Sequence, residues 1–485
     1  MAKTRMKDML VILPGIMGSV LKRDDKIIWE PGLGMTSNLF KQKQWLDDLY
    51  LKRDELTTES VDHVVATGLI ESRVLVPGFK KIGGYTELRD KIDDTFFLRK
   101  GDPTIDGPPC NYFEFSYDWR RDNRVAAAQL QALIERELPK WQSLAGQDAR
   151  VILVTHSMGG LVARYYTEVL QGWPNCRELI TFGTPYRGSL NALDFIANGY
   201  KKMFVDLSQV LRSFPSVYQL LPRYKAVLDE RPYSPTAGWC YIHDLDDVDF
   251  IDIQRARSAY DDFHEQIRTC QEQNAMAKGY ANFNLRPLVG FGQLTFNSAV
   301  LTTGGIEASR DLPFGVGRSW SGGDGTVPKV SAVPIEYSDG GPYRFINQQH
   351  ATLQSDDRLL IEEIAQRLRT MQESISAIRV GERGKPTAGA DSDEMPSISL
   401  KINDLYLPGE QIVVKATLSG IDDPGVVTAK VVNLDHGDEV DEVLNPDGSD
   451  FVGRFELGAG MYRIEVKTQT FVPAVGAVAD IFEVS

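Results

Sequence analysis

The sequence predicts an α/β domain with a mostly parallel sheet and helices on both faces, followed by a small all-β domain. Three observations lead to this prediction. Strand-like and helix-like hydrophobic patterns alternate through residues 1–379. Residues 380–396 are rich in glycine, proline, alanine and charged residues, without an apolar period, as is typical of a linker. Residues 397–485 show an apolar alternation of period two, interrupted by turn signals, which predicts an immunoglobulin-like sandwich.

The composition of the chain argues against some classes of binding partner. The 485-residue chain is 42% apolar and 25% charged, which is typical of a globular protein. Its net charge of −14 disfavours a nucleic-acid partner, since phosphate backbones are held mainly by lysine and arginine. The same charge disfavours simple electrostatic docking on anionic membranes, although a local apolar or basic rim is sufficient for a lipid substrate.

The sequence shows no pattern typical of export or of membrane insertion. No apolar run approaches the ~18 residues of a spanning helix, and Met9–Leu13 is too short for the apolar part of a signal peptide. We therefore expect a cytoplasmic protein, at most peripheral to a membrane. The four cysteines form no CxxC pair, so we expect free thiols, with Cys240–Cys270 as the alternative disulfide.

The α/β domain can be divided into elements from its hydrophobic patterns. Short apolar runs predict four strands: Met9–Leu13, Asn111–Tyr117, Val151–Val154 and Leu179–Phe182. Helical spacing predicts three helices: Val125–Leu138 ended by Pro139, Leu161–Leu170, and a closing helix from Leu360 to Ile378 that starts near Asp356 and Asp357. Two stretches, about 30–80 and 190–285, do not fit the alternation, and we expect them to cap the active-site edge of the sheet.

The C-terminal domain is predicted from three alternating runs and four turns. The runs are Ile398–Ile402, Ile412–Ala416 and Tyr462–Val466. The turns are Pro408-Gly409, Asp423–Gly425, Asp435–Gly437 and Pro446–Gly448. We see no catalytic constellation in this domain, and its one histidine, His436, lies in a turn where a surface role is expected.

The strongest chemical signal is the segment Val151-Ile-Leu-Val-Thr-His-Ser-Met-Gly-Gly-Leu161. A buried strand that turns sharply at a serine and continues as a helix is the nucleophile elbow of α/β-hydrolases. The turn requires small residues two before and two after the serine. Gly159 meets this need, and Thr155 is compact although the usual residue is glycine. Ser157 is therefore the predicted nucleophile, and the N–H of Met158 is a predicted oxyanion donor.

A nucleophilic serine requires a base, and in this fold the chain order is serine, acid, histidine. Elimination leaves His350, in Asn347-Gln-Gln-His350-Ala-Thr-Leu, just before the closing helix. The other histidines are misplaced: His156 adjoins the nucleophile, His63, His243 and His264 precede any late acid, and His436 follows the linker.

The acid that orients the base is expected upstream of His350, in a loop after a strand. Asp324 has this setting in Ser321-Gly-Gly-Asp324-Gly-Thr-Val-Pro328, where glycines on both sides allow the loop to pack closely. Asp311 and Asp339 are rivals without flanking glycines on both sides.

The oxyanion hole requires a second backbone donor from the loop after an early strand. Leu13-Pro-Gly-Ile-Met-Gly-Ser19 supplies such a loop, and its glycines permit a close approach. We expect the N–H of Ile16 or of Met17 to be this donor.

Taken together, the motifs resemble those of the lecithin:cholesterol acyltransferase family, which includes lysosomal phospholipase A2 and phospholipid:diacylglycerol acyltransferases. Seven segments match in family order across residues 9–370: Val11–Gly18, Val76–Phe79, Ser116–Arg120, Thr155–Gly159, Phe182–Pro185, Pro215–Leu221 and Gly323–Pro328.

The resemblance implies an enzyme that moves a fatty acyl chain from a phospholipid or another acyl-lipid onto Ser157, and then to water or an alcohol. It implies Asp324 as the acid, His350 as the base, and neither a cofactor nor a metal. Val76–Phe79 and the preceding segment correspond to the family's lid and membrane-contact region. Five side chains there either form an apolar surface or belong to the core: Trp29, Phe40, Trp45, Leu46 and Leu49.

The sequence also departs from the secreted members of that family. We expect no signal peptide, the sequence has no cysteine before Cys110, and we expect an extra β domain. These differences favour a cytoplasmic, bacterial, lipase-like relative. Two alternatives are a non-catalytic lipid-binding or scaffold protein on the same fold, and an effector phospholipase whose β domain binds a protein partner and regulates activity at a membrane.

Overall fold

The protein is described from a computed structural model, which covers residues 3–30, 47–71, 84–199, 208–377, 395–470 and 475–484. Its centre is a six-stranded sheet in which every pairing is parallel, in the order β15-β12-β9-β8-β2-β7. The strands are β2 (Met9–Leu13), β7 (Tyr112–Glu114), β8 (Val151–His156), β9 (Cys176–Phe182), β12 (Asn284–Phe291) and β15 (Arg344–Asn347). All residues of β2 and β8 are buried, as expected for strands covered on both faces.

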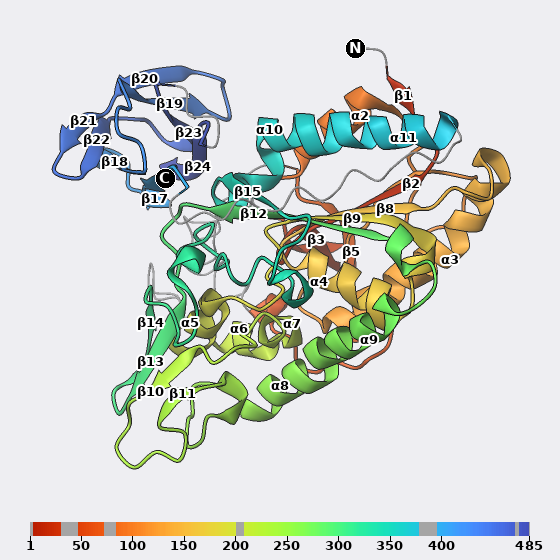
Figure 1. The fold of residues 1–485 in the computed structure, drawn as a ribbon, viewed down its shortest axis with the longest axis horizontal. Coiled ribbons are helices and arrows are strands. Elements are labelled where there is room, and N and C mark those ends of the chain that lie inside the picture. Colours follow the sequence, from red (N-terminus) through yellow and green to blue (C-terminus); the bar gives the residue numbers. More distant parts are fainter. Residues whose placement is uncertain are drawn as a thin grey trace.

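Helices cover both faces of this sheet (Figure 1). One face carries α3 (Asn123–Ala145) and α4 (Gly159–Arg164), which continues as a π-helical turn over Tyr165–Val169. The other carries α2 (Thr86–Thr95) and the closing helix, made of α10 (Asp357–Leu359), a π-helical segment and α11 (Leu368–Ala377). The predicted α/β architecture is confirmed, and Asp356 caps the closing helix with its carboxylate, which accepts from Arg358 and Leu359 N–H groups.

Several predicted boundaries were wrong, among them those of one strand and one helix. The strand predicted over Asn111–Tyr117 is limited to Tyr112–Glu114. The helix predicted to end at Pro139 continues to Ala145. Proline costs the helix one backbone hydrogen bond. Burial of Leu138 and Trp141, whose indole N–H donates to the Lys7 carbonyl at 2.6 Å, offsets that loss.

Smaller units surround the central sheet, and the regions predicted as insertions supply only some of their strands, namely β5, β10 and β11. A three-stranded sheet joins β3 (Ser19–Arg23), β4 (Lys26–Trp29) and β5 (Val64–Leu69), and β1 (Thr4–Arg5) pairs with β6 (Phe96–Phe97). A four-stranded sheet contains β10 (Val227–Asp229), β11 (Gly238–Cys240), β13 (Ser298–Thr302) and β14 (Gly305–Ser309). The helices here are α5 (Leu190–Asn198), α6 (Ser208–Ser213), α7 (Pro215–Tyr218), α8 (Ile253–Ser258) and α9 (Glu265–Ala275).

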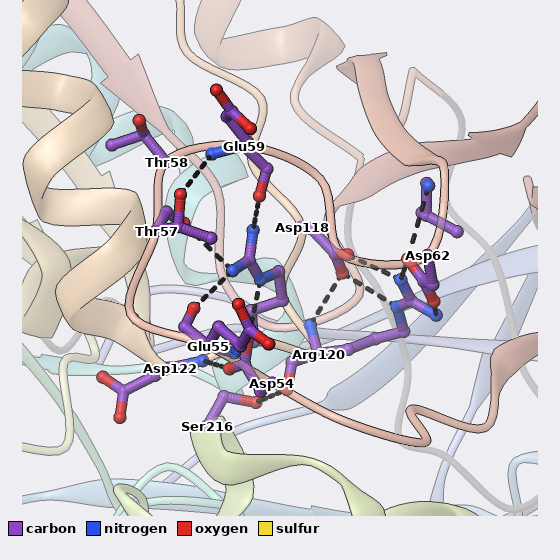
Figure 2. Close-up of polar contacts among 12 residues, drawn as sticks. Asp54, Glu55, Thr57, Thr58, Glu59, Asp62, Asp118, Arg120, Asp122 and Ser216 are labelled. Carbon is purple, nitrogen blue, oxygen red and sulfur yellow. Dashed lines mark hydrogen bonds and ion pairs between the residues drawn. The ribbon is translucent and has the colours of Figure 1, made fainter.

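Two arginines hold the segment before β5 to the start of α3 (Figure 2). Arg120 is fully buried and binds the carboxylates of Asp118 and Asp62. Arg121 binds the Asp54 carboxylate at 2.8 Å and three backbone carbonyls of residues 55, 57 and 59. Burial raises the pKa of Asp62, but Arg120 and Arg23 lower it more, so the net direction is downward. This ionic network ties a long irregular segment to the Ser116–Arg120 motif.

The sequence left open whether five apolar side chains form a lid surface or belong to the core, and the structure describes two of them. Trp29 and Leu49 are fully buried, and Trp29 packs edge-on against Trp119 with ring centroids 5.0 Å apart. Both belong to the core. Phe40, Trp45 and Leu46, and the Val76–Phe79 motif, lie outside the described residues.

The C-terminal region is a sandwich of two sheets with strand orders β16-β18-β22-β21 and β17-β24-β23-β19-β20. All pairs are antiparallel except β17–β24. The strands are β16 (Ser397–Lys401), β17 (Leu405–Tyr406), β18 (Ile412–Ser419), β19 (Val427–Asn433), β20 (Glu439–Val443), β21 (Asn445–Asp447), β22 (Asp450–Phe455), β23 (Gly460–Thr468) and β24 (Val478–Val484). The three predicted alternating runs are confirmed as β16, β18 and β23. Among the described residues, its apolar core consists of side chains from residues 398–484. Most of the predicted linker lies outside the described residues.

Three further observations concern the cysteines, membrane-spanning helices and metal-binding groups. The four cysteines are free, so the Cys240–Cys270 disulfide considered above does not form in this structure. Over the described ranges, no helix has both the length and the apolar character needed to cross a membrane. Over the same ranges, His, Cys, Asp and Glu side chains form no group of three or more that could hold a metal ion.

Candidate active site

The site lies at the carboxyl edge of the central sheet, where three loops meet. Ser157 follows β8, His350 follows β15, and Asp324 lies in the long connection after β12. Because the strands are parallel, their carboxyl ends share one edge, and side chains far apart in sequence come together there.

Ser157 occupies a strained turn. Its φ of +52° lies in the left-handed region, which a non-glycine residue rarely adopts. The backbone N–H of Ser157 donates to the Phe182 carbonyl at 2.8 Å, which ties the turn to the neighbouring strand β9. A strained serine between strand β8 and helix α4 is the local structure expected for a nucleophile elbow.

A chain of hydrogen bonds joins the three side chains predicted as a triad. The Nε2 atom of His350 lies 3.0 Å from the Ser157 Oγ, and its Nδ1 lies 2.7 Å from the Asp324 Oδ2. Asp324 is fully buried, and its other carboxylate oxygen accepts the N–H groups of Thr326 and Val327. With one oxygen held by two donors, the carboxylate presents the other to Nδ1–H, which leaves Nε2 as the acceptor for the serine hydroxyl.

The two rival acids do not reach His350. Asp311 is exposed, and its carboxylate accepts the hydroxyl of Ser309. Asp339 is also exposed, in the turn after residues 335–337.

The loop predicted to carry the second oxyanion donor packs directly against the serine. A Cβ placed on Gly15 would lie 2.8 Å from the Ser157 Cβ, so only glycine allows this approach. Gly15 and Gly18 close a turn in which Met17 has a φ of +63°. Among the described residues, none accepts a hydrogen bond from the N–H of Ile16, Met17 or Met158, so all three remain candidate oxyanion donors.

Aromatic side chains hold this loop in place, and sequence reasoning did not identify them in this role. The Gly15 N–H donates to the Tyr85 hydroxyl at 2.8 Å. Three aromatic side chains donate to backbone carbonyls of the loop: Tyr117 Oη to Pro14, Trp29 Nε1 to Met17 and Trp119 Nε1 to Ser19, at 2.9–3.1 Å. Tyr117 and Trp119 belong to the Ser116–Arg120 motif, so that motif supports the oxyanion loop from behind.

His156, which cannot reach the serine hydroxyl, connects the oxyanion loop to the base. Its Nδ1 lies 3.2 Å from the Tyr85 hydroxyl and its Nε2 lies 3.2 Å from the His350 carbonyl. Burial, together with the nearby His350, holds the pKa of His156 well below 6.5, although the hydrogen bond to the His350 carbonyl opposes this. A neutral His156 therefore accepts from Tyr85 and donates to His350.

A cleft of about 230 Å³ opens beside His350. The α/β part of the chain contributes Gly325, Thr326 and Gln349 to its lining, and the C-terminal sandwich contributes Leu400, Lys401 and Asp480. The sandwich therefore borders the space next to the predicted base.

Residues 110–313 match the family model described as lecithin:cholesterol acyltransferase, which confirms the resemblance over those residues. No curated protein sequence matches the chain.

Two solved structures of Bacillus licheniformis lipase BlEst2 are similar to this chain. The propeptide form is 13% identical with a TM-score of 0.32, covering 97% of this chain and 73% of the lipase. The mature form is 14% identical with a TM-score of 0.29, covering 76% of this chain and 94% of the lipase.

Proposed function

We propose that this protein is a serine-dependent lipid acyl hydrolase or acyltransferase. It takes a fatty acyl group from a phospholipid or glycerolipid onto Ser157 and passes it to water or to an alcohol. The observation that carries the proposal is the continuous hydrogen-bond chain from the Ser157 hydroxyl through His350 to the Asp324 carboxylate.

The first half of the mechanism forms the acyl-enzyme. His350 Nε2 takes the proton of the Ser157 hydroxyl while Oγ attacks the ester carbon. Asp324 keeps the imidazole oriented and stabilises its positive charge. The N–H of Met158 and that of Ile16 or Met17 stabilise the negative carbonyl oxygen of the tetrahedral intermediate. The imidazolium then gives its proton to the departing alcohol, and the acyl group remains on Oγ.

The second half repeats these steps with an acceptor. Water or an alcohol gives a proton to His350 and attacks the acyl carbon, and Ser157 leaves with that proton. The balance between hydrolysis and transfer therefore depends on how easily water and the alcohol each reach the site.

The lipid class of the substrate rests on homology. Residues 110–313 are homologous to a family of lipid acyltransferases, so we propose an acyl-lipid substrate and peripheral contact with lipid surfaces. A non-catalytic lipid-binding role on the same fold is the competing proposal. The preserved Ser157–His350–Asp324 geometry favours catalysis, because binding alone does not require these hydrogen bonds.

We further propose the division inferred from the sequence: a catalytic domain over 1–379 with cap insertions at about 30–80 and 190–285, a linker over 380–396, and a β-sandwich over 397–485. The separate apolar core of residues 398–484 supports the last boundary.

The test combines covalent labelling with product analysis. A fluorophosphonate probe should label the wild-type protein and not Ser157→Ala, and Ser143→Ala, an exposed serine on α3, should label normally. With mixed phospholipids as substrate, Ser157→Ala should lower kcat by a factor on the order of 10⁶, as in a serine protease that loses its nucleophile. Mass spectrometry with and without a sterol or diacylglycerol identifies the acceptor. A wild-type protein that binds lipid vesicles without labelling or turnover would support the binding role instead.

A further inference from the structure

The loops that carry the proposed acid and base are hydrogen-bonded to the C-terminal sandwich, which lies beside β12 and β15 (Figure 1). The described residues include eight such hydrogen bonds, and in each one a side chain from residues 293–358 meets a backbone group of the sandwich. The side chains are those of Gln293, Asn347, Gln348, Gln349, Thr352 and Arg358.

Three amide side chains replace a neighbouring strand along the free edge of β16. The Asn347 amide accepts the Ile398 N–H and donates to the Ile398 carbonyl. The Gln293 amide donates to the same carbonyl and accepts the Leu400 N–H. Gln349 donates to the Leu400 carbonyl at 3.1 Å. All four outward-facing backbone groups of Ile398 and Leu400 are therefore paired, as they would be inside a sheet.

A second contact is made to β24. Gln348 accepts the Ala479 N–H at 2.9 Å, and the Thr352 hydroxyl lies 3.0 Å from the Ala479 carbonyl. Gln348 is buried, and the same side-chain oxygen, Oε1, also accepts the backbone N–H of Gln349, so this side chain holds the backbone immediately before His350.

The junction is closely packed as well as hydrogen-bonded. Gly292 has a φ of +84°, and a Cβ there would lie 2.0 Å from the Asn347 amide nitrogen and 2.9 Å from the Ser397 Cβ. Only glycine at this position lets the Asn347 amide reach β16.

These hydrogen bonds involve the loops of both the proposed base, His350, and the proposed acid, Asp324. Asn347, Gln348 and Gln349 are the three residues that precede His350, and their side chains all engage in this network. The Gln293 N–H donates to the carbonyl of Gly323, the neighbour of Asp324, at 2.9 Å. The sandwich therefore contacts the loop before His350 through three successive residues, and it contacts the loop of Asp324 through Gln293.

We propose that the C-terminal sandwich is a positioning element of the active site, which holds the loops of Asp324 and His350 in register through Gln293, Asn347, Gln348, Gln349 and Thr352. This inference rests on the proposed function. None of these five side chains contacts the Ser157 hydroxyl, so they act through the base and the acid. Loosening the junction displaces the imidazole relative to Ser157, which lowers the rate of acyl transfer more than substrate binding.

The experiment uses full-length variants and a soluble short-chain ester, p-nitrophenyl butyrate. The double variant Gln293→Ala/Asn347→Ala removes the amides from the β16 edge. Thr352→Val removes one hydroxyl without changing the shape, and Thr352→Ser restores it. Asn433→Ala is the matched control, because that amide accepts N–H groups of Asp435 and His436 within the sandwich. Thermal unfolding checks that each variant is folded at the assay temperature.

We expect kcat of the double variant to fall by about 10- to 100-fold while KM changes less than about threefold. The rate of fluorophosphonate labelling should fall in parallel, although labelling still reaches one probe per chain. Thr352→Val should lower kcat and Thr352→Ser should restore it, which keeps the inference testable if the double variant does not fold.

Two results would overturn the inference without affecting the proposed function. One is a kcat equal to that of the wild-type protein in junction variants that are folded. The other is a kcat that rises when the junction is loosened. Absence of labelling and turnover in the wild-type protein would instead overturn the proposed function, and this inference with it.

Discussion

His350 and Asp324 are joined by backbone as well as by side chains. The backbone N–H of His350 donates to the Asp324 carbonyl at 2.8 Å, in addition to the 2.7 Å contact between Nδ1 and Oδ2. Two hydrogen bonds therefore connect the loops of Asp324 and His350, and together they oppose rotation of the imidazole away from the carboxylate. In the mechanism proposed above, this double connection keeps the base oriented before substrate arrives.

The first prediction concerns the identity of the acid. Asp324→Asn keeps the shape of the side chain and removes its charge, so the imidazolium that forms on His350 is no longer stabilised. We expect kcat for p-nitrophenyl butyrate to fall on the order of 10⁴-fold, as for the equivalent change in a serine protease. Asp311→Asn and Asp339→Asn are matched controls and should retain wild-type kcat. Loss of activity in either control, with Asp324→Asn active, would assign the acid elsewhere.

The second prediction concerns the support of the oxyanion loop. Tyr85→Phe removes the hydroxyl that accepts the Gly15 N–H and contacts His156. The loop then loses one anchor beside Ser157, and we expect kcat to fall about tenfold, with KM nearly unchanged. The unpaired buried N–H should also lower the free energy of unfolding by about 1–3 kcal/mol.

Tyr462→Phe is the control for Tyr85→Phe, since the Tyr462 hydroxyl donates to the Gly458 carbonyl within the sandwich. Steady-state kinetics and urea unfolding measure the two effects separately. Equal kcat in the two variants would show that the Tyr85 hydroxyl does not position the loop.

The third prediction concerns stability at acid pH. His264 is buried, and burial together with Arg223 lowers its pKa to about 3, although the hydrogen bond from its Nε2 to the Gln219 carbonyl opposes this. In the unfolded chain a histidine pKa is about 6.5, so between these values the unfolded state binds one more proton than the native state. The contribution of His264 to stability is thus present above pH 6.5 and is lost as the pH falls.

Comparison with His264→Gln isolates this effect. The free energy of unfolding of the wild-type protein, relative to the variant, should decrease by about 1.4 kcal/mol per pH unit between about pH 6 and pH 4. Urea unfolding at pH 7, 6, 5 and 4.5 measures this difference, and His436→Gln, at an exposed turn, controls for replacing a histidine. A difference that stays constant from pH 7 to 4.5 would contradict a neutral, buried His264.

The fourth prediction concerns the ionic network before β5. Arg121 is almost fully buried and binds one carboxylate and three carbonyls, which a single lysine ammonium cannot reach together. Arg121→Lys should therefore lower the free energy of unfolding by about 2–4 kcal/mol. It should also speed proteolysis within residues 53–60.

Arg53→Lys is the matched control, because Arg53 is exposed and its ion pair with Glu55 lies at the surface. A change below about 0.5 kcal/mol is expected there. Limited proteolysis with fragment sequencing locates the cleavage, and equal rates for both variants would mean that Arg121 does not anchor the segment.

The sequence predicted the site best where a local residue pattern coincides with a residue type that the chemistry requires. The apolar run of β8, followed by Ser157 and Gly159, predicts a strand, a sharp turn and a helix within one short segment. His350 followed from elimination, because the chain has only six histidines and the fold restricts their order. Four strands of the central sheet and three of the sandwich were predicted from their apolar patterns, since buried parallel strands and half-buried antiparallel strands leave different patterns. The sequence analysis missed β12 and β15, the central-sheet strands that precede Asp324 and His350.

Other features have no local signal. Pro139 ends a helix by its own chemistry, yet burial of Trp141 extends that helix, and a single sequence does not reveal where Trp141 packs. Tyr85 is 70 residues from Gly15, the loop residue it holds. The three amides before His350 resemble an ordinary polar loop in the sequence, and their partners in β16 and β24 become visible only in the folded structure.

By itself the sequence determined the fold class, the elbow and the candidate identities of nucleophile, acid and base, because residue type and short-range spacing carry that information. Only the tertiary structure decided what holds those groups in place. The buried tyrosines, the neutral His156 and the amides that pair with β16 each act across long sequence separations, and such contacts exist only once the sheet brings its loops to one edge.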